Sequence, residues 1–133
     1  MPFGARFGSV SSIERGRRFD PKPRNVRAAR EFVADALRDQ GFAGDYDTVL
    51  LLASELVTNA VRHAATPFEI RVDVERDGVH IEVIDGDGAH PPEVRNPGPD
   101  DTNGRGLLLV DQLSAGWGTD RVGGNKAVWF EGP

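Results

Sequence analysis

Apolar residues recur at two different spacings along the chain, and the change of spacing divides it into helices and strands. In the first part of the chain they lie three and four positions apart, which predicts a helix from about Asn25 to Gln40. Asn25 is a typical N-cap residue and Gly41 a typical helix terminator. The same spacing predicts a second helix that Asp45 or Asp47 caps and that runs to about Ala64. Beyond it the spacing falls to two, which predicts strands.

Strict alternation in two neighbouring segments predicts an antiparallel hairpin. Residues 68–75 and 79–84 alternate between apolar and polar side chains. The Asp77-Gly78 pair between them is typical of a tight hairpin turn. We therefore expect two half-buried strands, each with one apolar face toward a core and one polar face toward solvent.

The remaining elements complete a two-layer fold. A short strand is predicted at residues 16–20, a short apolar helix from residue 107, and a final hairpin from Trp117 to Phe130. The order helix, helix, hairpin, loop, helix, hairpin predicts an α+β two-layer sandwich, with about three helices on one face of a mixed, mostly antiparallel sheet.

Length and composition limit the number of domains and the kinds of site. The chain has 133 residues, which we divide into a flexible N-terminal tail (1–15) and one domain (16–133). It has no cysteine, so disulfides and thiolate metal sites are excluded, and three scattered histidines do not favour zinc. No apolar run approaches the ~20 residues of a membrane span, and no signal peptide is recognisable, so we expect a cytoplasmic protein.

Charge is distributed unevenly along the chain. Residues 1–30 contain eight Lys and Arg against two acidic residues, whereas the whole chain has a net charge of −5. The acidic remainder does not favour nucleic acid as the main ligand. Three arginines of the first predicted helix could instead meet an acidic protein partner: Arg24, Arg27 and Arg30.

A polar stripe on the second helix is the most informative feature of the chain. Glu55, Asn59 and Arg62 lie at positions i, i+4 and i+7, and therefore on one side of a regular α-helix whose other side is apolar. An amide oxygen can bind Mg²⁺, a guanidinium can neutralise phosphate, and a carboxylate can accept a proton. The alternative is an ordinary amphipathic helix with a mixed-charge outer face.

Two further features point to the same chemistry. Asp85 follows an apolar strand, where it could accept a hydrogen bond from the exocyclic amine of adenine, although it could also simply form a turn before Gly86. Gly104-Arg105-Gly106 opens a predicted helix, where free backbone N–H groups favour phosphate, although glycines also end loops. The segment between them, from residue 86 to 103, is rich in proline and glycine and long for a structureless loop.

Together these motifs resemble those of the GHKL (Bergerat-type) ATP-binding fold, and within it the bacterial anti-sigma factor serine/threonine kinases and their small stand-alone relatives. The resemblance covers about residues 17–131. The segments that carry it are LASELVTNAVRHA (52–64), IEVID (81–85), GRGLLLV (104–110) and GNKAVW (124–129).

The resemblance implies a role for each residue of the second helix. Asn59 would hold Mg²⁺ on the nucleotide phosphates, and Glu55 would be the base that takes the proton from an attacking serine hydroxyl. Arg62 and His63 would lie near the phosphates. The expected cofactors are thus ATP and Mg²⁺.

The resemblance also implies roles for the later motifs. Asp85 would bind the adenine amino group, and residues 86–103 would form a mobile lid. The nucleotide-binding residues at the start of the following helix would be Gly104, Arg105, Gly106 and Leu107.

The function implied is an ATP-binding regulator that phosphorylates a serine of a STAS-type anti-anti-sigma protein and sequesters a sigma factor, with no direct nucleic-acid or membrane partner. A homodimer is compatible with the resemblance. The chain departs from the family pattern at Asp87 and Ala89, where glycine is usual, and at Lys126 and Ala127 in place of a threonine. These departures favour the alternative of a non-catalytic binding module with a degenerate nucleotide pocket.

Overall fold

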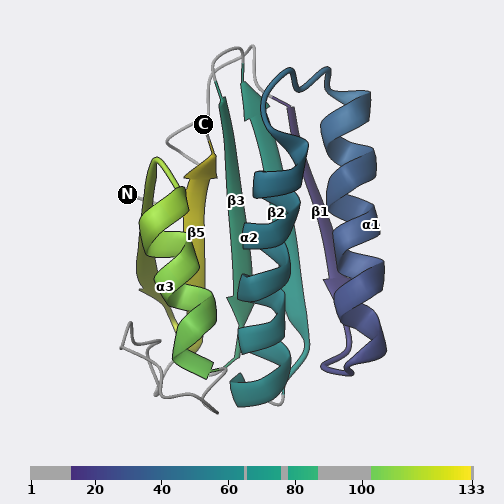
Figure 1. Ribbon diagram of the computed structural model, residues 1–133. Helices are drawn as coiled ribbons and strands as arrows, with labels where there is room; N and C mark the ends of the chain where they lie inside the picture. The colour runs from purple at the N-terminus through teal and green to yellow at the C-terminus, as the bar shows by residue number, and fades with distance from the viewer. Residues whose placement is uncertain (1–12, 65, 76–77, 87–102, 133) are drawn as a thin grey trace.

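The computed structural model describes residues 13–64, 66–75, 78–86 and 103–132, and shows a sheet with a layer of helices on one face (Figure 1). Every pair of neighbouring strands in this five-stranded sheet is antiparallel. The predicted α+β sandwich is therefore confirmed, with a described sheet that is wholly antiparallel. The strands, in their order across the sheet, are β1 (Ile13–Phe19), β2 (Phe68–Glu75), β3 (Gly78–Asp85), β5 (Asn125–Gly132) and β4 (Gly116–Val122).

Helix α2 (Tyr46–Asn59) lies between α1 (Arg24–Asp39) and α3 (Asn103–Leu113) and packs against both. A short π-helix, η2 (Ala60–Ala64), continues α2. The core lies between the helices and the sheet, where the apolar faces predicted from the spacing meet. Its largest fully buried apolar side chains include Leu37, Leu52, Phe68, Ile70, Ile81 and Phe130.

The sequence predicted the end of the first helix correctly but not its N-cap. Helix α1 begins at Arg24, because Pro23 in the N-cap position already has helical backbone angles. Asn25 is therefore not the cap; it lies in the first turn, where its Nδ2 donates to the backbone oxygen of Asp20 (2.9 Å). Gly41 ends the helix with a φ of 75°, as expected, and Asp45 caps α2.

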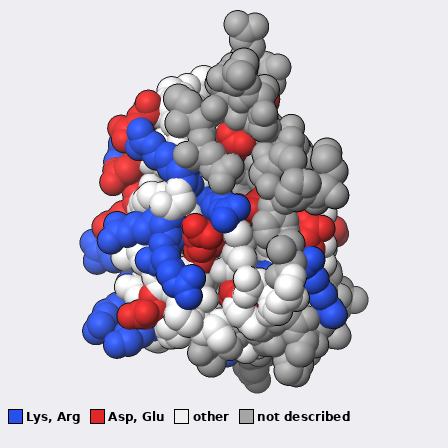
Figure 2. All heavy atoms as spheres, turned by 180° about the vertical axis from the view of Figure 1, so that it is seen from behind, with Lys and Arg blue, Asp and Glu red and all other residues white. Residues whose placement is uncertain are grey.

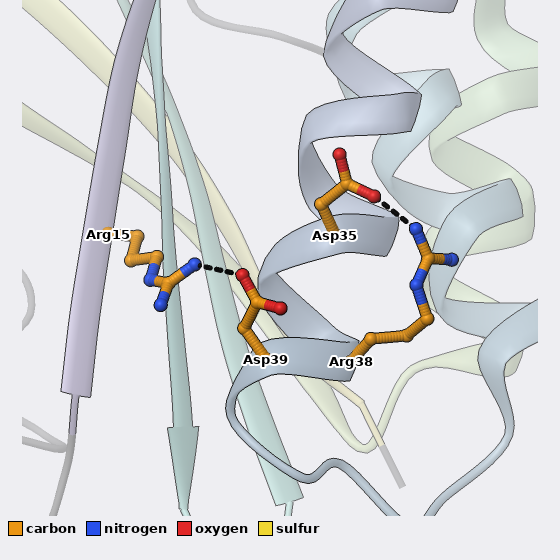
Figure 3. Close-up of polar contacts among 4 residues, drawn as sticks. All are labelled: Arg15, Asp35, Arg38 and Asp39. Carbon is orange, nitrogen blue, oxygen red and sulfur yellow. Dashed lines mark hydrogen bonds and ion pairs between the residues drawn. The ribbon is translucent and has the colours of Figure 1, made fainter.

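Strand β1 begins earlier than the sequence indicated. Its pairing with β2 runs from Ile13 to Phe19, so its first three residues belong to the segment that we assigned to the tail. Too few apolar residues alternate there to reveal the strand, and its backbone partners lie in β2. An ion pair between Arg15 Nη1 and Asp39 Oδ2 (2.6 Å) joins this edge strand to α1, and a second pair, Arg38 with Asp35, lies within the helix (Figure 3).

The face of the sheet opposite the helices is less exposed than alternation predicts. Asp73, His80 and Glu82 point to this face and yet are at most 3% exposed. His80 Nε2 lies 2.8 Å from Glu82 Oε1, and its ring stacks on Trp129 of β5 at 5.3 Å. The expectation that β3 is half buried is therefore wrong, since two polar side chains of its outer face, His80 and Glu82, are buried as well.

Figure 2 shows this same face, with basic and acidic side chains interspersed on the side where β1 and β2 lie. Strand register places Arg18 opposite Glu69 there, and Glu69 in turn pairs with Arg71 (3.2 Å). This face of the sheet therefore has oppositely charged side chains close together on β1 and β2, and buried polar side chains toward its centre.

Some predictions fall on residues that the structure does not describe. Residues 1–12 of the predicted tail, residues 76 and 77 of the hairpin turn, and residues 87–102 of the predicted lid are among them. No helix within the described residues is long and apolar enough to cross a membrane.

Candidate functional site

Three elements end or begin at the same edge of the molecule. The end of α2 with η2, the last residue of β3 and the first turn of α3 all lie at the lower end of the view in Figure 1. Helix α3 packs against α2, and η2 packs against β3. The motifs that the sequence separates by up to about fifty residues therefore meet in space.

A hydrogen bond fixes part of this convergence. The backbone N–H of Gly86, the residue after β3, donates to Thr66 Oγ1 (2.9 Å), just beyond η2. A Cβ atom at Gly86 would lie 3.3 Å from the Thr66 side chain. The end of β3 is thus held against the segment that directly follows η2.

Helix α2 supplies Glu55 and Asn59, one turn apart and both partly buried. Desolvation by burial raises the pKa of the Glu55 carboxyl above its ordinary value. A carboxylate that water solvates poorly is a better proton acceptor than an exposed one, and this suits a base.

The π-helix changes the geometry of the stripe. A π-helix repeats i→i+5, so its turn is wider than that of an α-helix. The alignment predicted for a continuous α-helix holds for Glu55 and Asn59, whereas Arg62 lies beyond the change of pitch. Arg62 and His63 are both exposed on η2. No signal in the sequence indicated this segment, although π-helices frequently occur at functional sites.

Asp85 is the last residue of β3 and is 4% exposed. Alternation along β3 places it on the helix-facing side of the sheet, with Val83 and Ile81. Lys126 of β5 lies directly opposite, with its Nζ 3.7 Å from Asp85 Oδ2 and with 6% of its own surface exposed. The sequence marked Lys126 as a departure from the family pattern; its pairing with Asp85 follows from the β3–β5 register.

Helix α3 brings the glycine motif to the same edge. Gly104, Arg105 and Gly106 form its first turn, and the buried Leu107 and Val110 anchor it in the core. The first N–H groups of an α-helix have no partner within the helix, and together with the helix dipole they favour an anion. The first turn of α3 therefore presents N–H groups of the kind that favour phosphate, at the same edge as the end of α2 (Figure 1).

The donor set fits a magnesium nucleotide. Among the described residues no group of three or more His, Asp or Glu side chains could hold a metal ion. The amide oxygen of Asn59 is a neutral ligand of the kind that Mg²⁺ accepts alongside phosphate oxygens of a nucleotide. The buried carboxylate of Asp85 can accept a hydrogen bond from a nucleobase.

Comparison with known proteins identifies the family of the chain. The family model of the histidine kinase-like ATPase domain matches residues 19–131. An uncharacterised protein of Streptomyces coelicolor, SCO4941, is 34% identical over 82 residues, which are 59% of this chain and 78% of that protein.

A solved structure shows the same fold. The crystal structure of the RsbU and RsbW domains of Rv1364c from Mycobacterium tuberculosis superimposes with a TM-score of 0.65 at 18% identity. The match covers 90% of this chain, which spans about a third (32%) of the length of that one. The resemblance in fold inferred from the sequence is thus confirmed. Because the family model covers nearly the whole domain, the chain belongs to the family of histidine kinase-like ATPase domains.

Proposed function

We propose that this protein is an anti-sigma-factor-type regulator that binds Mg-ATP, phosphorylates a serine of a STAS-domain anti-anti-sigma protein and sequesters a sigma factor. The observation that carries the proposal is Glu55, a half-buried carboxylate one helical turn before Asn59 in an ATPase-family fold. A domain that only bound nucleotide would not need a poorly solvated base at this position, since burying a carboxylate costs free energy.

Each residue has a defined part in the proposed transfer. Asp85 would orient the adenine base, the first turn of α3 and Arg62 would balance the phosphate charge, and Asn59 would hold Mg²⁺. Bound Mg²⁺ would neutralise phosphate charge. Glu55 would accept the proton of the serine hydroxyl as the serine oxygen bonds to the γ-phosphorus. The bond from phosphorus to the bridging oxygen would then break, and ADP would leave. Such a reaction depends mainly on positioning and charge neutralisation.

The test is phosphate transfer to a STAS-domain protein from the same organism. Purified protein, Mg-ATP labelled in the γ-phosphate and the STAS partner should yield a phosphorylated partner, and a serine-to-alanine substitution in the partner should abolish the label. Glu55→Gln should lower the transfer rate by at least about 100-fold, a typical contribution of a general base, with ATP affinity nearly unchanged. A co-purification with the cognate sigma factor tests sequestration separately.

The second candidate is a non-catalytic partner-binding module with a degenerate nucleotide pocket. The ion pair between Asp85 and Lys126 favours it, since the residue expected to bind adenine already has a charged neighbour within the chain. Normal binding of the STAS partner without phosphate transfer in Mg-ATP would select this candidate and reject the kinase.

A further inference from the structure

We propose that Lys126 is a specificity-determining residue of the nucleotide site, which donates a hydrogen bond from its ammonium group to N1 of adenine while Asp85 accepts one from the exocyclic amine. This inference rests on the proposed ATP site. It adds to that site the residue that recognises N1, the second hydrogen-bonding position of adenine. Nothing in the family resemblance assigns a lysine to this task.

The first argument is position. Asp85 and Lys126 are partners in the antiparallel register of β3 and β5, so their side chains emerge side by side from the helix-facing side of the sheet. They do so at the edge of the sheet where β3 ends and β5 begins. The proposed site for the adenine base therefore has two polar side chains, Asp85 and Lys126, instead of Asp85 alone.

The second argument is the state of the pair. The two side chains are 2% and 7% exposed, and the charged atoms are 3.7 Å apart, which is an ion pair longer than a normal hydrogen bond. A buried ion pair contributes little net stability, because desolvating both ions offsets most of their attraction. Stability is therefore a weak reason to bury a lysine beside Asp85, and a ligand that accepts from one side chain and donates to the other supplies a further reason.

The third argument is chemical complementarity. The edge of adenine carries a donor, the exocyclic amine, beside an acceptor, N1. An aspartate accepts only and a lysine donates only, so the pair matches this edge and fixes its orientation. Guanine in the same orientation would place its carbonyl oxygen against Asp85 and its N1–H against Lys126, and so would leave both protein groups badly paired.

The experiment removes the two partners of the proposed bond in turn. Isothermal titration would measure the affinity of the wild type, Lys126→Met and Lys126→Gln for ATP and for 1-deaza-ATP, in which a C–H group replaces N1. We expect the wild type to bind 1-deaza-ATP about 10-fold more weakly, as for the loss of one charge-assisted hydrogen bond.

The variants separate this bond from general effects of the substitution. Lys126→Met keeps the length of the side chain without a donor, and should bind ATP and 1-deaza-ATP equally. Lys126→Gln keeps an N–H donor without the charge, and should still prefer ATP. Thermal denaturation of all three proteins checks folding. If Lys126→Met does not fold, the role of Lys126 is tested by Lys126→Gln and by the affinities of the wild type for ATP and 1-deaza-ATP.

The outcomes distinguish the two proposals. A wild type that binds no ATP overturns the nucleotide site and this inference together. The role of Lys126 is overturned if the wild type binds ATP and 1-deaza-ATP with equal affinity. It is also overturned if Lys126→Met still binds 1-deaza-ATP as much more weakly than ATP as the wild type does. Neither result contradicts the ATP site itself. Tighter binding of GTP than of ATP would show that the pair reads the edge of guanine instead.

Discussion

Strands β3 and β5 carry two buried polar pairs, one on each face of the sheet. On the helix-facing side Asp85 and Lys126 are joined across the two strands at 3.7 Å. On the opposite face His80 and Glu82 are joined along one strand at 2.8 Å, with the ring of His80 stacked on Trp129. The two pairs are equally buried, so burial alone does not identify the functional one.

The difference lies in geometry and surroundings. The His80–Glu82 contact has hydrogen-bond length and is covered by an indole ring, which is the arrangement of a structural contact. The Asp85–Lys126 contact is longer and lies where two helix ends and a strand end converge. The pair at the end of β3 and the start of β5, where the proposed nucleotide site lies, is the one to which we assign a function. Substitutions in the Asp85–Lys126 pair should therefore change ATP affinity, whereas substitutions in the His80–Glu82 pair should change the stability of the fold.

The largest expected effect is at Asp85. Asp85→Ala removes the acceptor for the base and leaves Lys126 buried without this carboxylate, so ATP affinity should fall by about 100-fold or more. Isothermal titration with Mg-ATP measures it. Asp39→Ala, which removes an equally charged residue from the exposed pair with Arg15, is the matched control and should bind ATP like the wild type. Equal affinities of the two variants would refute the site.

On the opposite face the effect should be on stability. Glu82→Ala removes the partner of His80 Nε2 and leaves a gap beneath the sheet surface, which should lower the free energy of unfolding by about 2 kcal/mol. Urea denaturation measures it. ATP affinity should stay within about twofold of the wild type, and a large loss of affinity would mean that the two faces are not separable.

A smaller structural effect is expected at Gly118. A Cβ atom there would lie 2.7 Å from Cζ2 of Trp129, so Gly118→Ala must displace the indole that stacks on His80. We expect a loss of about 1–2 kcal/mol by overpacking, measured by urea denaturation, again with ATP binding retained. Gly123→Ala is not a suitable control, since its φ of 61° strains any side chain. Ser114→Ala, outside both pairs, should change stability less.

The smallest expected effect is on the stability of a Glu55 variant, and it is a gain instead of a loss. Because burial raises the pKa of Glu55 in the folded state, the folded protein favours the protonated carboxyl, and this contribution to stability is lost as the pH rises through the folded pKa. Glu55→Gln should therefore be slightly more stable than the wild type at pH 7, with an advantage that disappears below the unfolded pKa of a glutamate. Melting temperatures at pH 4 and pH 7 test this, and a variant less stable at pH 7 would contradict it.

Local patterns predicted most of the scaffold. Alternation between residues 68 and 84 identifies β2 and β3, and the cap at Asp45 identifies the start of α2, because both depend on neighbours in the sequence. The candidate residues of the site were found because their types and order resemble those of a known family.

The parts that the sequence did not reveal depend on distant partners. The Asp85–Lys126 pair requires the register of β3 with β5, and the η2 segment depends on packing against β3. The burial of His80 and Glu82 was missed because alternation treats a polar side chain as exposed, whereas here a stacked Trp129 covers it.

The bond between Gly86 and Thr66 offers a way to observe the site without any ligand label. Its amide proton belongs to the residue after Asp85, and its acceptor lies just past η2. Exchange of that single proton with deuterated solvent requires the strand end and the helix end to separate. Its protection factor, followed by NMR, would thus report how often the two halves of the site part, and nucleotide that spans them should slow the exchange.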